Sequence, residues 1–155
     1  MRIDELYPYW DDVHQDLLGT LEGLTEEQLE FRPRDCAYSI HQIVLDFAYQ
    51  EQYLISHLVG GHAFDRPRAV DYADRASLVE LLNATREVTA MVLDPYTTAG
   101  LRAVRTMPAD PNNNQPETNV SVGWILWRTL EYEVFYYGQV KLRLEDSGKV
   151  KRQWE

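Results

Sequence analysis

The chain has 155 residues, enough for one domain, and its composition, 45% hydrophobic and 26% charged, is ordinary for a globular protein. No run approaches the ~18 uninterrupted apolar residues of a membrane span, the acidic N-terminal segment does not resemble a signal peptide, and a formal net charge of −10 opposes binding to nucleic-acid phosphates. We therefore expect one cytoplasmic domain over residues 1–155, without a membrane or nucleic-acid partner.

Two helices are predicted near the N-terminus. Apolar residues recur every three or four positions over residues 4–23, which is the spacing of one helix face. Thr25 and Gln28 match a capping box, so a second helix is expected to begin just after Thr25. Pro33 keeps this second helix short, because proline breaks a helix interior.

The next predicted helix follows Ser39, a residue type that favours the N-cap position. Its apolar stripe continues until Gly60 and Gly61, where the helix is expected to stop. Two acidic residues interrupt this pattern. Glu51 lies on the apolar stripe itself, and Asp46 lies at its border.

A polar stretch and a third long helix come next. Within residues 61–75, Arg66 and Arg68 are interpreted as solvated surface residues. The periodic apolar positions that follow predict a helix from residue 74 or 77 to Leu93. Pro95 ends it.

Residues 95–119 form one long stretch rich in proline and asparagine, which predicts an irregular loop of the kind that is often functional or mobile. Residues 101–107 within it are compatible with an extended segment but are not predicted to form a sheet. The last helix is expected to begin at Asn119 or Ser121 and to end near Asp146. The sequence therefore predicts an all-α four-helix bundle with one long irregular loop before the last helix.

The histidines and the single cysteine form no recognisable metal or catalytic motif. None of the histidines has another at the i, i+4 spacing of a helical metal site, and each is interpreted as a surface residue or a partner at a helix end: His14, His41, His57 and His62. Cys36 excludes an internal disulfide and a cysteine-based zinc site because it has no second cysteine. We interpret Cys36 as an inert thiol.

Acidic residues and tyrosines remain as candidates for chemistry. Tyr132 and Tyr136 lie one turn apart on the last helix, and Glu133 flanks them. If this helix neighbours the one that carries Asp46 and Glu51, the side chains converge. One interpretation is packing, with the tyrosine hydroxyls bonded to Asp46 or Glu51. The other is catalysis, with Asp46 as a base and a tyrosine as the proton donor. The predicted pocket consists of Asp46, Glu51, Arg128, Tyr132, Glu133 and Tyr136.

The order and spacing of three segments resemble the DinB-like (YfiT-type) superfamily. These segments are Thr25-Glu-Glu-Gln-Leu, residues 39–46 with Glu51 five positions later, and Glu131-Tyr-Glu-Val-Phe-Tyr-Tyr-Gly-Gln. The resemblance runs from Trp10 to Gly148. It implies an up-down-down-up four-helix bundle, commonly a homodimer. It also implies a divalent metal, Zn²⁺ or Ni²⁺, held by three histidines, and in some members thiol-dependent transferase or isomerase activity.

The positions of the three family histidines fall on Asp46, Tyr132 and Tyr136 in this sequence, whereas the neighbouring Glu133, Gly138 and Gln139 are kept. Neutral phenols, with a pKa near 10, are poor ligands for Zn²⁺ or Ni²⁺ at neutral pH. We therefore predict no metal cofactor and a reshaped cavity at this place.

Three functions are left open by these residues. The first is a metal-free protein that binds a small molecule, or that dimerises without catalysis. The second is a thiol-dependent transferase or isomerase with a modified site on Asp46, Tyr132 and Tyr136, in which Arg128 lowers a tyrosine pKa and the loop of residues 95–119 closes over the substrate. The third is an interaction protein with an acidic surface.

Overall fold

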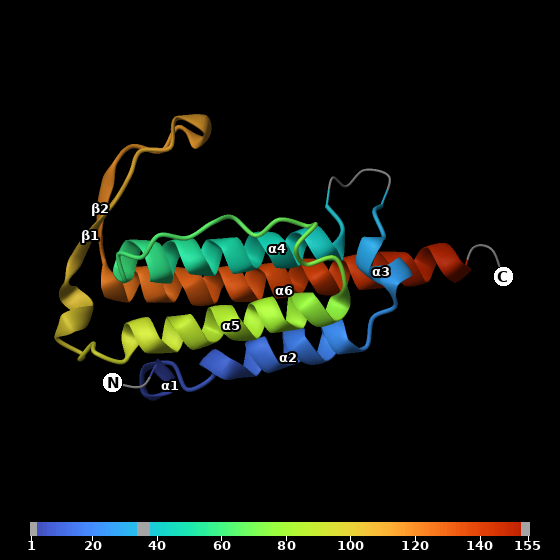
Figure 1. The fold of residues 1–155 in the computed structure, drawn as a ribbon, viewed down its shortest axis with the longest axis horizontal. Coiled ribbons are helices and arrows are strands. Elements are labelled where there is room, and N and C mark those ends of the chain that lie inside the picture. The colour runs from blue at the N-terminus through green and yellow to red at the C-terminus, as the bar shows by residue number, and fades with distance from the viewer. Residues whose placement is uncertain (1–2, 34–37, 153–155) are drawn as a thin grey trace.

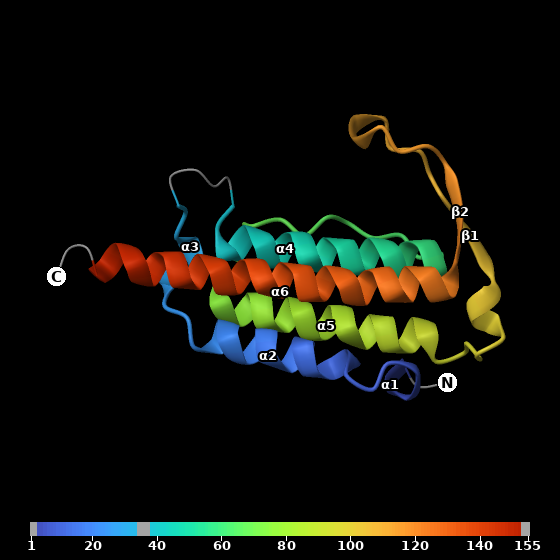
Figure 2. The ribbon, with the colours of Figure 1, turned by 180° about the vertical axis from the view of Figure 1, so that it is seen from behind.

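The computed structural model describes residues 3–33 and 38–152. Within these residues, four long helical segments lie side by side (Figures 1 and 2). They are α2 (Trp10–Glu22), α4 (Ile40–Glu51) with its π-helical continuation η1 (Gln52–Val59), α5 (Arg75–Leu93) and α6 (Val122–Arg152). The predicted helical class is confirmed. Cys36, interpreted above as an inert thiol, lies outside the described residues.

The predicted first helix is wrong in one respect, because Pro8 divides it. A short helix, α1 (Ile3–Leu6), precedes the proline, and α2 begins after it at Trp10. A turn joins the two, closed by a 2.9 Å hydrogen bond from the Trp10 amide to the Tyr7 carbonyl. The apolar periodicity runs through this break and therefore conceals it.

The helix starts predicted after Thr25 and Ser39 are confirmed, and residue 74 is confirmed as one of the two starts given for the third long helix. Thr25 caps α3 (Glu26–Glu30), and the reciprocal contact with Gln28 completes the capping box. Ser39 caps α4 in the same way through Gln42. Asp74 caps α5, with its carboxylate 2.8 Å from the Ser77 amide. Each cap satisfies backbone donors that have no partner inside their helix.

The stretch of residues 95–119 contains a sheet that was not predicted. Strand β1 (Val104–Met107) pairs antiparallel with β2 (Thr118–Ser121). A short 3-10 turn, η2 (Gly100–Arg102), precedes β1, and a second one, η3 (Pro111–Asn113), lies in the tip between the strands. Each strand has only four residues, and a tip rich in proline and asparagine hides the hairpin in the sequence. The hairpin rises at one end of the bundle, and its tip bends over the side of α4 (Figure 1).

The last helix is longer than predicted. It starts after Ser121, whose hydroxyl accepts a 3.1 Å hydrogen bond from the Trp124 amide. It continues past the predicted end near Asp146, through Gly148, as far as Arg152. A single glycine costs a helix only about 1 kcal/mol relative to alanine, so it does not have to end one.

The apolar core consists of two clusters at different levels of the bundle. One includes Phe47, Leu78 and Val140, and the other, nearer the hairpin, includes Ile55 and Leu126. In α4 with η1, in α5 and in α6, polar residues separate the positions that belong to the two clusters. Within the described part of the chain, no helix is both long and apolar enough to cross a membrane.

Candidate functional site

The six residues of the predicted pocket divide between two places. Glu51 and Glu133 lie inside the bundle, with 1% and 0% of their surface exposed. The other four, Asp46, Arg128, Tyr132 and Tyr136, lie on the outer side of α4 and α6 and are only partly buried. α4 and α6 are neighbours, as the prediction required, but two of the six side chains point into the bundle and four point toward its outer side.

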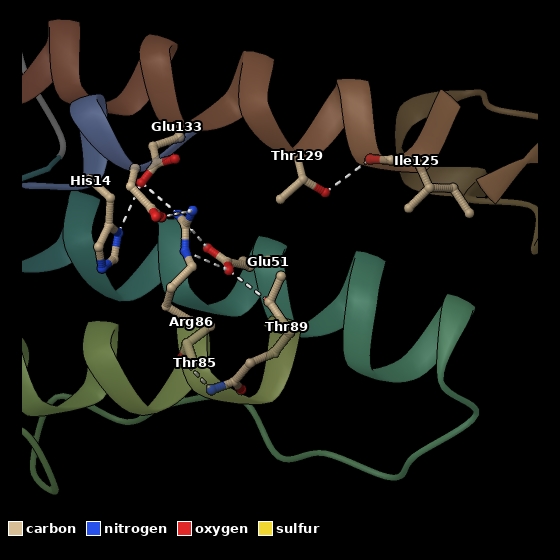
Figure 3. Close-up of polar contacts among 10 residues, drawn as sticks. His14, Glu51, Thr85, Arg86, Thr89, Ile125, Thr129 and Glu133 are labelled. Atoms are coloured by element: carbon tan, nitrogen blue, oxygen red, sulfur yellow. Dashed lines mark hydrogen bonds and ion pairs between the residues drawn. The ribbon is translucent and has the colours of Figure 1, made fainter. Parts of the chain in front are cut away.

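Arg86 of α5, which was not predicted, joins the two inner carboxylates. Its Nη2 lies 2.7 Å from Glu133 Oε1, and its Nε lies 3.2 Å from Glu51 Oε1. The hydroxyl of Thr89 donates a 2.7 Å hydrogen bond to Glu51 Oε1. Figure 3 shows these side chains converging from α4, α5 and α6. They form a buried polar layer between the two apolar clusters.

His14 connects α2 to the same layer, so its interpretation as a surface or helix-end residue is wrong. It is 2% exposed, and its Nδ1 lies 3.0 Å from Glu133 Oε1 (Figure 3). Trp10, one turn earlier on α2, places its ring 4.7 Å from the Arg86 guanidinium carbon. Four helices therefore meet through one set of buried charged and polar groups.

Burial controls the electrostatics of this layer. It raises the pKa of Glu51, and the nearby Arg86 guanidinium opposes that shift. Burial also acts to lower the pKa of Arg86, but Glu51 and Glu133 outweigh it and the pKa of Arg86 is raised. Arg86 is thus held in its charged form between two carboxylates. Because its side chain is only 13% exposed, the layer is suited to joining helices rather than to meeting a substrate.

On the outer side of α4, Asp46 is paired with Arg66. The Arg66 Nη2 donates a 2.6 Å hydrogen bond to Asp46 Oδ1. The same guanidinium stacks on the ring of Tyr49, one turn after Asp46, with its carbon 4.7 Å from the ring centre. Arg66 reaches this place because the connection of residues 60–74 runs back along α4 (Figure 1). Its side chain is 65% exposed, as a solvated surface residue is expected to be, and it also lines the candidate site.

On α6, Arg128 makes the contact with Tyr132 that its spacing predicts. Its Nη2 donates a 3.2 Å hydrogen bond to the Tyr132 hydroxyl, and its guanidinium carbon lies 4.5 Å from the ring centre. Arg128 also pairs with Glu131. The Tyr132 hydroxyl is therefore bonded by Arg128, not by Asp46 or Glu51 as the packing interpretation expected.

Tyr136 is half-buried and packs on aromatic neighbours. Its ring centre lies 5.9 Å from that of Phe47 and 6.2 Å from that of Tyr132. Burial, reinforced by the negative charge of Asp46, raises the pKa of Tyr136 to about 12. The hydroxyl thus stays protonated at neutral pH and is a poor base or metal ligand.

A cavity of about 600 Å³ lies between α4, η1, α6 and the hairpin tip. Residues 107–110, 112, 113 and 115 of the hairpin form one wall. The opposite walls carry aromatic and positively charged side chains: Tyr49, Tyr53, Arg66, Trp124, Arg128 and Tyr132. Its volume is within the range of small-molecule sites. Asp46 and Tyr136 do not line this cavity, but each contacts a residue that does. Asp46 contacts Arg66, and Tyr136 contacts Tyr132.

Sequence reasoning missed two arginines, and for different reasons. Arg86 has a sequence signal, because it continues the inward spacing of Leu82, Thr89 and Leu93 along α5 as a lone charge on an apolar stripe. Arg66 has none, because it lies in an irregular segment whose path is set by tertiary contacts. A buried arginine needs an acidic partner, so the position of Arg86 could have predicted an ion pair with Glu51, which also lies on an apolar stripe.

Within the described ranges, no three His, Cys, Asp or Glu side chains gather closely enough to hold a metal ion. The sequence profile of the DinB superfamily matches residues 9–140 of the chain. Comparison with curated proteins gives no match.

Proposed function

Since the chain belongs to the DinB superfamily, we propose that it is a metal-free member, an up-down-down-up bundle that binds a small organic molecule in the cavity beneath its hairpin. The order of the helices is supported by the connection of residues 60–74, which returns along α4 before α5 begins (Figure 1). One observation carries the functional proposal. The side chains at the three family ligand positions are engaged by protein groups instead of being left open to a metal.

The donor chemistry at these positions does not suit a divalent cation. Asp46 is neutralised by Arg66 at 2.6 Å. The Tyr132 hydroxyl already accepts a hydrogen bond from Arg128, a positively charged group that repels a metal ion. Tyr136, with a pKa of about 12, gives up its proton too reluctantly to serve as a ligand. No step of the proposed function therefore depends on a metal.

Metal analysis tests this proposal directly. Protein purified without chelator is expected to carry far less than one Zn²⁺ or Ni²⁺ per chain by inductively coupled plasma mass spectrometry. The variant Asp46→His/Tyr132→His/Tyr136→His, which restores the family donor types, is the positive control and is expected to gain metal. A stoichiometric metal in the unmodified protein that survives dialysis contradicts the proposal.

One contact favours the alternative, a thiol-dependent transferase or isomerase with a modified site. Arg128 donates to the Tyr132 hydroxyl, the arrangement that a catalytic tyrosine requires. The test is transfer between glutathione and an aryl halide, followed by absorbance. Tyr132→Phe and Asp46→Asn are expected to abolish any activity under the alternative. If the wild-type protein is inactive, or if both variants retain full activity, the alternative is wrong.

We also propose that two copies associate through the outer face of α6. Trp127, Val134, Phe135 and Leu142 are each about half exposed and recur at helical spacing along this face. Gly138, one turn after Val134, has open space above it. In an antiparallel pair, Val134 of each copy fits over this glycine of the other, as a symmetric interface requires.

Light scattering coupled to size-exclusion chromatography tests the association. The wild-type protein is expected to elute as a dimer and Phe135→Glu as a monomer. Met91→Glu is the matched control, because Met91 is an equally exposed apolar residue on α5, away from this face. A monomeric wild-type protein, or a Phe135→Glu dimer, shows that α6 is not the interface.

A further inference from the structure

The resemblance implies that residues at the positions of Asp46, Tyr132 and Tyr136 bind a cation, but in this chain arginine side chains contact two of these positions. Two of the three family ligand positions receive a guanidinium group, Asp46 from Arg66 and Tyr132 from Arg128. Both arginines also line the cavity. Guanidinium groups therefore stand where the resemblance implies a divalent cation, and each is paired with one carboxylate, Arg66 with Asp46 and Arg128 with Glu131.

Both guanidinium groups retain donors beyond these contacts. A guanidinium has five N–H groups on three nitrogens. Among the described residues, the hydrogen bonds of Arg66 use Nη2, and those of Arg128 use Nη1 and Nη2. The remaining N–H groups can meet an oxyanion, the ligand group that arginine recognises best.

The charges around the cavity oppose a ligand with more than one negative charge. The charged lining residues are Arg66 and Arg128 on the helical side and Asp110 at the hairpin tip. Arg66 is paired with Asp46, and Arg128 is paired with Glu131. With Asp110, the two positive charges and three negative charges leave a local net charge of −1, on a chain whose net charge is −10. A dianion gains less here, because its second charge meets Asp110 and the acidic surface.

The remaining lining residues favour a planar body for the ligand. The rings of Tyr49 and Tyr53 are stacked, with centres 6.3 Å apart and planes inclined by 16°. Trp124 also lines the cavity and is 38% exposed. Flat aromatic walls contact planar organic groups over a large area without ordering many flexible side chains.

We propose that this cavity, taken as the ligand site of the proposed function, binds a small planar organic monocarboxylate, with the remaining N–H groups of Arg66 and Arg128 donating hydrogen bonds to its carboxylate oxygens. The carboxylate lies toward the two guanidinium groups, and the ring lies against Tyr49, Tyr53 and Trp124. Binding needs no metal and weakens as salt screens the charges.

Equilibrium binding of three probes to the full chain tests this inference. Benzoate, benzamide and phenyl phosphate share a ring but carry one, zero and about two negative charges. Titration calorimetry up to about 10 mM covers the weak affinity of such small ligands. Benzoate is expected to bind saturably and at least about tenfold more tightly than benzamide, the loss that accompanies removal of a hydrogen bond to a charged group. Phenyl phosphate is expected to bind more weakly than benzoate.

Matched arginine variants locate the site. Arg66→Gln and Arg128→Gln are each expected to weaken benzoate binding about tenfold. Arg68→Gln is the control, because Arg68 also pairs with an acidic neighbour, Asp71, but does not line the cavity. Both tested arginines are partly exposed, so the variants are expected to fold, which circular dichroism checks.

The outcomes separate this inference from the proposed function. Equal binding of benzoate and benzamide, unchanged binding in both arginine variants, or no binding of benzoate up to about 10 mM overturns the monocarboxylate inference. None of these results alters the metal content, on which the proposed function depends. A stoichiometric bound metal contradicts the proposed function instead.

Discussion

Arg86 is the residue on which the buried polar layer depends. It contacts both Glu51 and Glu133, and its guanidinium is the positive charge that offsets them. Replacing it with methionine leaves two buried carboxylates without a counter-charge. We expect Arg86→Met to lower the free energy of unfolding by about 3–5 kcal/mol, measured by urea denaturation.

Two further variants decide whether this loss comes from charge. In Arg86→Met/Glu51→Gln/Glu133→Gln, the carboxylates are gone as well, and we expect much of the stability to return. Arg68→Met breaks an exposed pair with Asp71 and should cost at most about 1 kcal/mol. If Arg86→Met is no more destabilising than Arg68→Met, the buried layer does not contribute as argued.

Glu51 gives the layer a dependence on pH. Burial raises its pKa in the folded state above the ordinary 4.5, so the folded protein binds this proton more tightly than the unfolded chain does. The stabilisation linked to the proton is complete below about pH 4.5 and is lost as the pH rises through the folded-state pKa. Glu51→Gln is neutral at every pH. Its free energy of unfolding relative to the wild type should therefore increase as the pH rises.

Urea denaturation of both proteins at a series of pH values measures this difference. Glu87→Gln, on the exposed side of α5, is the matched control for the chemical change. A difference between Glu51→Gln and the wild type that stays constant with pH, or that falls as the pH rises, contradicts the argument.

At the scale of elements, local chemistry was enough to predict where most helices start. Ser39 and Asp74 satisfy backbone donors within three residues of themselves, so their effect is contained in the sequence around them. The hairpin was missed because four-residue strands become stable only by pairing across a connection whose path the sequence does not reveal. Helix ends were less predictable, since packing carries α6 through Gly148.

Replacing two glycines with alanine is expected to change the stability of the protein in opposite directions. A Cβ atom on Gly60, at the end of η1, meets the Ser56 carbonyl oxygen at 2.8 Å and Val92 Cγ2 at 3.1 Å. Gly60→Ala should therefore force a backbone shift and lower stability by about 1–3 kcal/mol. Gly19, inside α2, has nothing within 4 Å of such an atom. Gly19→Ala should raise stability by about 0.5–1 kcal/mol through helix propensity.

Thermal unfolding followed by circular dichroism compares the two alanine variants with the wild type. The opposite signs are the informative result, because the chemical change is identical. A loss of stability in Gly19→Ala would mean that the outer face of α2 is covered in solution. A neutral Gly60→Ala would mean that the end of η1 adjusts more easily than its close contacts indicate.

At the scale of the whole molecule, the bundle and the cavity depend on different parts of the chain. The predicted pocket required α4 to lie beside α6, and the two helices are in contact, but it united side chains that point to the core with side chains that point outward. Helical spacing already separates Asp46 from Glu51, because five residues place them about 140° apart around the helix, but the prediction grouped them by their position along it. Arg66, the partner of Asp46, arrives from a connection without periodicity, and only the folded chain brings it there.

The hairpin tip allows binding to be separated from folding. Met107 and Thr118 are paired across the hairpin, so an Asn-Gly turn can join them in place of residues 108–117 and keep the strands in register. The tip makes local contacts, such as the bridge between Asp110 and Gln115, and it supplies one wall of the cavity. We expect this replacement to change the free energy of unfolding by no more than about 1 kcal/mol. It should weaken benzoate binding below detection in the same titration.

Asn113→Ala, a single change in the same tip, controls for loss of one polar contact and should retain most of the binding. Strong binding by the shortened protein would place the ligand elsewhere on the helical surface, because the cavity loses its outer wall in that variant. Loss of cooperative unfolding would instead show that the tip supports the bundle. The expected result, a stable bundle that no longer binds, requires that the four helices fold without the tip and that the tip encloses the ligand.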